Sequence, residues 1–429
     1  MKRIQIKDVK PGENVRVSGF VENLRNKRAM AFLVIRDVTG KIQVTVEKEK
    51  FPEIAEKIDR LTLESVVTVE GAAVANEYVK LNGIEIIPAA LGINSVADAL
   101  PVQEVSSIDH RMDYRWLDLR SEKNTLIFKV QTCIASAFRQ VLAKENFLEI
   151  HSPKLISAAS ESGADVFELD YFGGKAYLAQ SPQFYKQMAM ASGFERVFEC
   201  GPVFRAEKSH TNRHATEFTG FDLEMSYIES FHDVMLLQQK MIAHMLETVK
   251  NQYGEDIKRL FGVEIIVPST PFPIIKLADV YAELSERYGY TLPMEEQGDL
   301  TTEAEQLCGK LARDKFDHEF MFITDYSADR RAFYHMRDEN GKAFGYDLIW
   351  KGVEITTGAQ REHRYDILKK QADEKGLGED IKHYLEFFKY GCPPHGGFGM
   401  GLDRITMLAL NITIKEVMFL FRGPNRLTP

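Results

Sequence analysis

The sequence has few cysteines, no long apolar run and no excess of positive charge. The four cysteines are Cys133, Cys200, Cys308 and Cys392. Their spacing includes no CxxC pair, which excludes a zinc-finger framework and argues against a disulfide-stabilised scaffold. No stretch approaches the ~20 apolar residues of a membrane span, and the N-terminus lacks the apolar core of a signal peptide. We therefore expect a cytoplasmic protein in a reducing compartment, without a membrane partner.

Two common nucleotide-binding loops are also missing. The sequence contains neither GxGxxG nor GxxxxGK[ST], since the glycines from Gly397 to Gly401 have a different spacing. A nucleotide would therefore be bound without either phosphate loop. The 54 basic and 63 acidic residues give a net charge of −9. Such a surface repels polyanions on average, so a nucleic-acid partner would require locally basic patches.

The length of 429 residues, at about 150 per domain, predicts two or three domains. The first part is rich in Val and Ile. It predicts strands at about 13–21, 30–37, 41–46, 63–73 and 83–90, with a helix at about 51–61. Five strands with a helix after the third match the Greek-key barrel that binds oligonucleotides, and another small β barrel is the alternative. On this barrel Phe32 is a candidate for base stacking, and Gln43 and Glu85 are candidates for base-edge hydrogen bonds. A core position is the alternative for Phe32.

An amphipathic helix follows a charged connector. Its apolar residues recur at helical spacing, namely Leu126, Val130, Ile134, Phe138, Val141 and Leu142. It ends near Asn146, and a strand at 147–150 precedes Pro153, which lacks a backbone donor and is typical of a strand edge or an interface. Strands and helices alternate from there to the end of the sequence.

The segment 199–225 predicts a strand, a loop and a returning strand. The period of two puts Arg205 and Glu207 on one face, and Asp222 and Glu224 on one face of the returning strand. The reverse face of that strand carries Phe221, Leu223 and Met225, which we expect in the core. The loop is cationic and suits phosphate groups. A solvated face with a basic turn is the alternative.

Two later segments complete the pattern. A glycine-rich strand at 395–401 leads into a helix whose first turn would hold Arg404, where the helix dipole favours anions. The other is the segment 350–363, which lies between the segment 199–225 and this glycine-rich strand and contains Glu354, Thr357 and Arg361.

Together and in this order, these segments resemble class II aminoacyl-tRNA synthetases. Phe204-Arg205-Ala-Glu207 with Phe218 is similar to their second motif, Gly399-Met-Gly401-Leu-Asp-Arg404 to the third, and the helix leading to Pro153 to the first. The closest likeness within the class is to aspartyl-tRNA synthetases of the archaeal and eukaryotic cytoplasmic type. It is carried by Gln180-Ser-Pro-Gln183-Phe-Tyr-Lys186-Gln, Thr211-Asn-Arg213-His214, Gly358-Ala-Gln-Arg361-Glu-His and Tyr390-Gly-Cys-Pro-Pro-His395.

The resemblance implies the architecture. We expect an N-terminal all-β OB-fold barrel at 1–95 that binds the anticodon through Phe32, Gln43 and Glu85, followed by a hinge at 96–121. An α+β catalytic domain built on an antiparallel sheet, the class II synthetase fold, would occupy 122–429, with an inserted helical subdomain at about 229–345. The family also implies a homodimer with residues 128–153 at the interface.

The resemblance further assigns residues to the nucleotide and the metal. ATP would be bound by Arg205, Glu207, Arg213, His214, Phe218, Glu354, Gly401 and Arg404. Adenine would lie between Phe218 and Arg404, and the arginine forks suit adjacent phosphate oxygens. Glu354 and Thr357 would hold Mg²⁺, which prefers oxygen ligands. Arg205, Arg404 and Glu354 would be the catalytic residues.

Aspartate would be bound by Glu161, Gln183, Lys186, Arg205, Asp222, Thr357 and Arg361. Lys186 and Arg361 would converge on the side-chain carboxylate. Asparagine in that place would leave buried cations uncompensated, at a cost of about 3–5 kcal/mol. The related asparaginyl enzymes carry an apolar residue at the position of Lys186.

Some residues depart from the family pattern. Ser162 replaces a glycine in the loop that closes over the amino acid, and Lys208 is typical of asparaginyl enzymes. In the family, strict preference for tRNA-Asp goes with a tryptophan at the position of Glu22, so Glu22 indicates that tRNA-Asn is also accepted. Lys80, at the other position linked to discrimination, indicates a strict preference instead. We expect tRNA-Asp as partner, with tRNA-Asn as a second substrate.

Three alternatives remain open at this point. One is an asparaginyl-tRNA synthetase. The second is a synthetase-like protein that no longer aminoacylates, against which the retention of Arg205, Glu354, Arg361 and Arg404 argues. The third is an amide synthetase that adenylates free aspartate, against which the N-terminal barrel argues.

Overall fold

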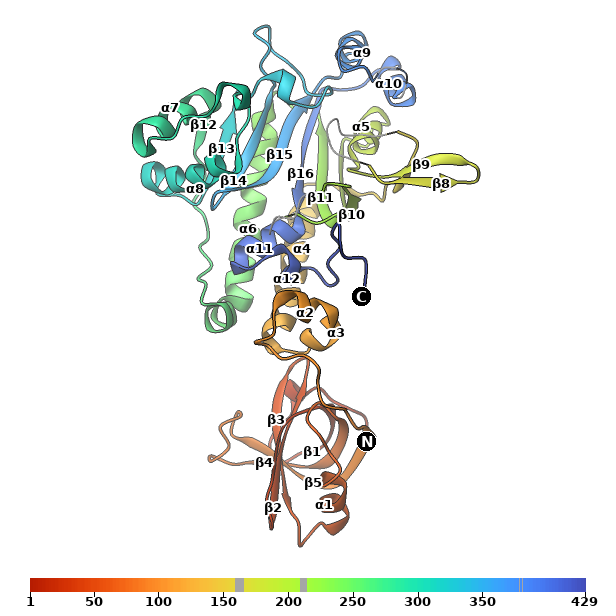
Figure 1. Ribbon diagram of the computed structural model, residues 1–429, viewed down its shortest axis with the longest axis vertical. Helices are drawn as coiled ribbons and strands as arrows, with labels where there is room; N and C mark the ends of the chain where they lie inside the picture. The colour runs from red at the N-terminus through yellow and green to blue at the C-terminus, as the bar shows by residue number, and fades with distance from the viewer. Residues whose placement is uncertain (159–165, 209–213, 378, 380) are drawn as a thin grey trace. The chain divides into compact units, whose positions relative to one another are not determined.

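The computed structural model describes residues 1–158, 166–208, 214–377, 379 and 381–429. These residues form two compact units, Met1–Asp118 and Leu119–Pro429. In Figure 1 the first unit is coloured red to orange, and the second runs from orange through green to blue.

The first unit contains a closed five-stranded barrel with the strand order β1-β2-β3-β5-β4. Its elements are β1 (Asn14–Asn26), β2 (Met30–Asp37), β3 (Gly40–Glu47), α1 (Pro52–Ile58), β4 (Val66–Ala75) and β5 (Ile84–Ser95), followed by α2 (Ile108–Asp113) and α3 (Arg115–Asp118). Alternate apolar side chains fill the interior, as Leu33 and Ile35 of β2 do with no exposed surface. The predicted barrel, with its helix after the third strand, is confirmed.

The second unit is built on an eight-stranded sheet with the order β12-β13-β14-β15-β16-β11-β10-β6. Its strands are β12 (Ile274–Lys276), β13 (Phe320–Thr324), β14 (Gly345–Trp350), β15 (Val353–Arg361), β16 (His395–Gly401), β11 (Glu217–Ser226), β10 (Arg196–Phe204) and β6 (Leu148–Glu149). The inner pairs are antiparallel, and parallel pairing occurs at the two edges, between β12 and β13 and between β10 and β6. The expected α+β fold on a largely antiparallel sheet is confirmed.

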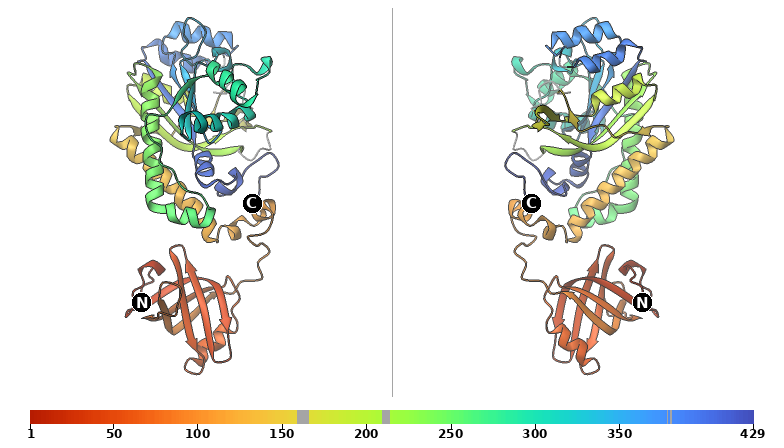
Figure 2. Two further views of the ribbon diagram at one scale, coloured as in Figure 1. Left: turned by 90° about the vertical axis from the view of Figure 1, so that its left-hand side faces the viewer. Right: turned by 90° about the vertical axis from the view of Figure 1, so that its right-hand side faces the viewer.

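Helices surround this sheet. They are α4 (Glu122–Lys144), α5 (Gln183–Ala191), α6 (Phe231–Phe261), α7 (Leu277–Tyr288), α8 (Thr302–Phe316), α9 (Tyr365–Glu374), α10 (Lys382–Lys389), α11 (Leu402–Leu410) and α12 (Ile414–Val417). The long helices α4 and α6 pack against each other and against one side of the sheet (Figure 2). A small sheet with the order β7-β9-β8 is formed by β7 (Leu155–Ile156), β9 (Gly174–Leu178) and β8 (Glu168–Tyr171).

Helix α4 is the amphipathic helix predicted from the sequence. Its periodic apolar residues are buried, and the ring of Phe138 stacks on that of Phe221 with 4.1 Å between centroids. By length and composition α4 is also long and apolar enough to cross a membrane, which the sequence analysis did not anticipate. Half of that stretch is buried inside the unit, and core helices of globular domains meet the same criterion.

The segment 229–345 contains several parts. Helix α6 begins at a capping box, in which Ser230 and Asp233 satisfy each other's backbone donors, and it packs on α4. Strand β13 belongs to the central sheet. Helices α7 and α8 form a separate layer beside β13, with Val280, Leu284 and other apolar residues in a shared core. This layer supports the side of the sheet that carries β14 and β15.

Candidate active site

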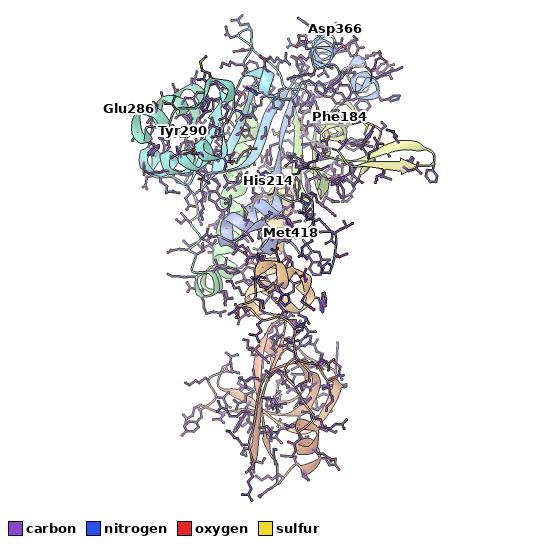
Figure 3. All side chains as sticks on the ribbon, in the orientation of Figure 1. Phe184, His214, Glu286, Tyr290, Asp366 and Met418 are labelled. Atoms are coloured by element: carbon purple, nitrogen blue, oxygen red, sulfur yellow. The ribbon has the colours of Figure 1, made fainter. Side chains whose placement is uncertain are left out.

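A cavity of about 710 Å³ lies over the face of the central sheet opposite α4 and α6, between segments predicted to carry chemistry. Among its lining residues are Gln183, Arg205, Glu207, His214, Phe218, Asp222, Glu354, Thr357, Arg361, Gly401 and Arg404. Of the other predicted site residues, Glu161 and Arg213 lie outside the described residues, as does Ser162. The cavity thus brings together residues from four separate segments of the chain. His214 is close to the central sheet in Figure 3.

Strand register explains why these side chains meet. Strand β15 pairs with β14 on one side and β16 on the other, so Thr357 lies between Asp347 and Gly399. On β16 glycines alternate with larger residues, and a Cβ atom built on Gly399 would lie 2.9 Å from Oδ1 of Asp222. One on Gly397 would lie 2.5 Å from Oε2 of Glu224. These glycines therefore allow two carboxylates of β11 to approach the neighbouring strand.

Buried ion pairs lie behind one end of the cavity, where Arg361 and Asp222 line it. Nε of Arg361 donates to Oε1 of Glu224 at 3.0 Å, and Nζ of Lys186 lies 3.6 Å from Oε2 of the same carboxylate. Nζ of Lys186 also donates to Oδ1 of Asp222 at 2.9 Å. Lys186 and Arg361 therefore converge on one carboxylate, that of Glu224, a residue the sequence analysis placed on this face but did not assign to the site.

The charge of Glu224 is maintained by its neighbours. Burial alone would raise its pKa, but Arg361, Lys186 and His395 together hold the pKa of this carboxyl below its usual value. Lys186 is fully buried and does not itself line the cavity. Its ammonium holds the carboxylate of Asp222, which does line the cavity.

A chain of amide hydrogen bonds fixes the orientation of this end. Nη2 of Arg361 donates to Oε1 of Gln183 at 3.3 Å, and Nε2 of Gln183 donates to Oε1 of Gln187 at 3.0 Å. The Tyr384 hydroxyl donates to the same oxygen at 3.0 Å. Nε2 of Gln187 then donates to Nε2 of His395 at 3.0 Å, and Nδ1 of His395 donates to the Pro393 carbonyl at 2.8 Å. Each donor in this chain has an acceptor, which sets the tautomer of the buried imidazole.

The other end of the cavity combines arginines with an aromatic ring. The guanidinium of Arg205 lies 5.5 Å from the centroid of the Phe218 ring, and Nη1 of Arg205 is 4.0 Å from Oε1 of Glu207. Arg404 occupies the first turn of α11, as predicted, and donates to the Glu354 carbonyl at 2.7 Å. This end offers cations, a stacking surface and a carboxylate, which suits a nucleotide with its phosphates.

A group of oxygen atoms lies between the two ends. Oγ1 of Thr357 is 2.9 Å from Oε1 of Glu354 and 2.9 Å from Oδ1 of Asp347. Burial and then the Asp347 carboxylate raise the pKa of Glu354 to about 7. These oxygens are of the type that a hard cation such as Mg²⁺ prefers as ligands, so the set fits that ion. Asp347 was missed in the sequence because its β14 segment carries no motif.

The oxygen set holds fewer protein groups than a closed metal cage. In the described parts of the chain, no three His, Cys, Asp or Glu side chains are grouped to hold a metal ion. Mg²⁺ is commonly held by one or two carboxylates together with substrate phosphates. The pair of Asp347 and Glu354 beside Thr357 agrees with that pattern.

The three barrel residues predicted to contact nucleic acid lie on one outer face. Phe32 and Gln43 alternate with buried residues of β2 and β3, and Gln43 is in register with Glu85 of β5. Nε2 of Gln43 donates to Oε2 of Glu85 at 3.2 Å, and Nδ2 of Asn76 donates to Oε1 at 2.8 Å. Phe32 is therefore a surface residue, half-buried, and not part of the barrel core.

We predict that His395 makes the free energy of unfolding depend on pH. Burial is the main cause that lowers its pKa from 6.5 to about 4. The unfolded chain then binds the proton more tightly, so this contribution is complete above pH 6.5 and is lost as the pH falls towards 4. It amounts to about 3 kcal/mol at most. Urea unfolding of the wild type and of His395→Asn between pH 4 and 7 measures it. Equal slopes of the unfolding free energy with pH in the two proteins would contradict the assignment.

Comparison with known proteins places the two units in known families. Residues 107–422 match the family of tRNA synthetases class II (D, K and N), and residues 15–89 match the OB-fold nucleic acid binding domain. The chain is 42% identical to an aspartate–tRNA(Asp/Asn) ligase of Methanopyrus kandleri over 98% of each protein. It is 41% identical to an aspartate–tRNA(Asp) ligase of Pyrococcus abyssi over 97% of each.

Solved structures agree with these sequence relationships. The asparaginyl-tRNA synthetase of Pyrococcus horikoshii complexed with asparaginyl-adenylate superposes with a TM-score of 0.91 and 32% identity, covering 100% of both chains. An aspartyl tRNA synthetase from Entamoeba histolytica superposes with a TM-score of 0.88 and 31% identity, covering 100% of this chain and 93% of that one. The chain therefore belongs to the class II tRNA synthetases, in the family of the aspartate–tRNA ligases.

Proposed function

We propose that the cavity activates L-aspartate with ATP and transfers the aspartyl group to tRNA-Asp and also to tRNA-Asn. Arg361, which lines the cavity and is held from behind by Glu224 next to Lys186, carries the choice of aspartate. The relatives from Methanopyrus kandleri and Aeropyrum pernix are named for both tRNAs, which supports the broader tRNA range, whereas the Pyrococcus abyssi relative is named for tRNA(Asp) alone. In the barrel, Glu22 occupies the position linked to discrimination, and its carboxylate accepts from Lys41 at 2.7 Å.

Charge separates aspartate from asparagine, because the two have nearly the same shape. Arg361 lines the cavity and would face the side-chain carboxylate, with Lys186 adding its charge from behind Asp222. Gln183 and Asp222 would bind the α-ammonium, and Glu161, Arg205 and Thr357 would complete the aspartate subsite. Asparagine is neutral and would lack the ion pair that the aspartate carboxylate would form with Arg361.

The proposed chemistry uses no protein nucleophile. The α-carboxylate of aspartate attacks the α-phosphorus of ATP in line, and the bond to pyrophosphate breaks as the aspartyl-adenylate forms. The terminal ribose hydroxyl of the tRNA then attacks the aspartyl carbonyl and releases AMP. Arg205, near the α-phosphate, and Arg404, near the γ-phosphate, would stabilise the developing charge, with Arg213 and His214 assisting. Phe218, Glu207 and Gly401 would hold the adenosine.

Magnesium would be held by Glu354 and Thr357, and we add Asp347 from the structure. When bound, Mg²⁺ would neutralise phosphate charge and orient the β- and γ-phosphates. Arg331 supports this set, because its Nη1 donates to Oδ1 of Asp347 at 3.0 Å.

The remaining expectations follow from family membership. We propose that residues 1–95 bind the anticodon through Phe32, Gln43 and Glu85, that 96–121 form a hinge, and that 122–429 catalyse the reaction in the cytoplasm. We also propose a homodimer through residues 128–153. Leu148, on the edge strand β6, is 52% exposed, which supports a contact at this edge.

The substrate assignment predicts the effect of Lys186→Met. Loss of this cation leaves Asp222 and Glu224 undercompensated, so aspartate-dependent pyrophosphate exchange should fall about 100- to 5,000-fold. Lys175→Met is the matched control, since that lysine is exposed on β9 and should change nothing. Exchange that depends on asparagine in the wild type, or a loss below tenfold in Lys186→Met, would contradict the assignment. Aminoacylation of purified tRNA-Asp and tRNA-Asn then tests the tRNA range.

The magnesium assignment predicts a difference between two substitutions of Thr357. Thr357→Val removes the oxygen but keeps the shape, so the Mg²⁺ concentration for half-maximal pyrophosphate exchange should rise about tenfold. Thr357→Ser keeps the oxygen and should behave as the wild type. Equal Mg²⁺ requirements in the valine and serine variants would show that Thr357 does not hold the metal.

A further inference from the structure

His335 lines the cavity, and neither the sequence motifs nor the proposed chemistry gives it a role. It lies in the segment between the short 3₁₀ helix Ala328–Arg330 and strand β14. Its side chain belongs to the wall near Arg361, and only 3% of the residue is exposed.

Backbone pairing fixes where the imidazole lies. His335 forms an antiparallel bridge with Arg361, and Arg361 is in turn paired with His395 on β16. Directly opposed residues of antiparallel neighbours have their side chains on the same face, with Cβ atoms about 5 Å apart. A row of His335, Arg361 and His395 therefore crosses the cavity face, and Arg361 has a histidine on each side.

The two histidines differ in their hydrogen bonds. Both ring nitrogens of His395 have partners inside the protein, the Pro393 carbonyl and the Gln187 amide. Nδ1 of His335 is buried, and within the described residues no group pairs with it. Buried polar atoms without partners are rare, and His335 lines the cavity, so its ring has hydrogen-bonding capacity that the described protein groups do not use.

The surroundings of His335 specify the chemistry of that group. Arg361, Arg331 and Arg337 are the charged groups near the ring, and with burial they keep the imidazole neutral by lowering its pKa well below its usual value. Guanidinium groups have no acceptor atoms, so none of these arginines can accept the imidazole N–H. Nδ1 faces Gly345 of β14, since a Cβ atom built there would lie 3.5 Å from this nitrogen. An anion with acceptor oxygens, such as a carboxylate, fits this environment.

On the basis of the proposed function, we infer that His335 is a specificity residue for the amino acid. The single N–H group of its neutral ring donates a hydrogen bond to the side-chain carboxylate of bound aspartate, next to Arg361. A neutral donor at this position favours an acceptor oxygen and adds no further charge to a site that already holds two cations. The proposed aspartate subsite thus also includes the chain segment that precedes β14.

The test replaces His335 and measures the KM for aspartate and for ATP in pyrophosphate exchange. His335→Leu should raise the KM for aspartate about tenfold, the effect of one hydrogen bond to a charged group, and leave the KM for ATP within twofold. His335→Asn carries an amide donor near the place of Nδ1, and His335→Gln near the place of Nε2. One of the two should restore the KM for aspartate to within about threefold.

The matched control is His244→Leu. Nε2 of His244 on α6 is also buried without a partner in the described chain, but His244 does not line the cavity. Its substitution should leave the KM for aspartate unchanged. The inference is overturned if His335→Leu binds aspartate within twofold of the wild type, if neither amide variant restores the KM, or if the KM values for aspartate and ATP rise together.

A second measurement does not depend on the folding of the leucine variant. In protein labelled with ¹⁵N-histidine, aspartate should shift the ring resonance that is missing in His335→Gln, and asparagine should shift it less. An unchanged resonance at saturating aspartate overturns the inference. Failure of the proposed function is distinguishable, because the wild type would then show no aspartate-dependent exchange at all.

Discussion

One buried carboxylate, that of Glu224, determines how the cavity is organised. It is fully buried and lies between the ammonium of Lys186 and the guanidinium of Arg361. Without it, two cations would be buried close together at a high energetic cost. With it, both cations are held in place and Asp222 remains close enough to connect Lys186 to the cavity. The proposed aspartate subsite therefore depends on a residue that need not touch the substrate.

The central sheet places these charged side chains on the face that lines the cavity. Glycines on β16 leave the space that the carboxylates of β11 occupy, and β15 presents Thr357 and Arg361 on the same face. The layer of α7 and α8 supports the far side, where Glu305 of α8 accepts from the backbone N–H of Glu354 at 3.2 Å. The strands thus hold the proposed nucleotide end, the oxygen set and the proposed amino-acid end in fixed relation, as catalysis by positioning requires.

Much of this organisation could be predicted from the sequence, because its signals are local. Periodicity predicts α4 and the buried face of β11, and Val- and Ile-rich runs separated by turns predict the barrel. The first turn of α11 with Arg404 follows from a glycine-rich strand that runs into a helix. Resemblance to the synthetases supplied the joint assignment of Lys186 and Arg361, which lie far apart in the sequence.

Other features could not be predicted, because they depend on strand register between distant segments. Asp347 is adjacent to Thr357 only because β14 pairs with β15, and His335 is adjacent to Arg361 only through one isolated bridge. Glu224 looks like an ordinary polar-face residue in sequence, and its burial follows from α5 covering this part of β11. The role of the segment 229–345 could not be predicted from the sequence either, since it combines a core helix, a strand of the central sheet and a surface layer of helices.

The central claim is that paired buried cations select a dicarboxylic amino acid. Calorimetric titration of the wild-type protein with aspartate and with asparagine tests it directly. An ion pair between Arg361 and the side-chain carboxylate predicts that aspartate binds at least about 100-fold more tightly than asparagine. Equal dissociation constants for the two amino acids, or tighter binding of asparagine, would contradict the account.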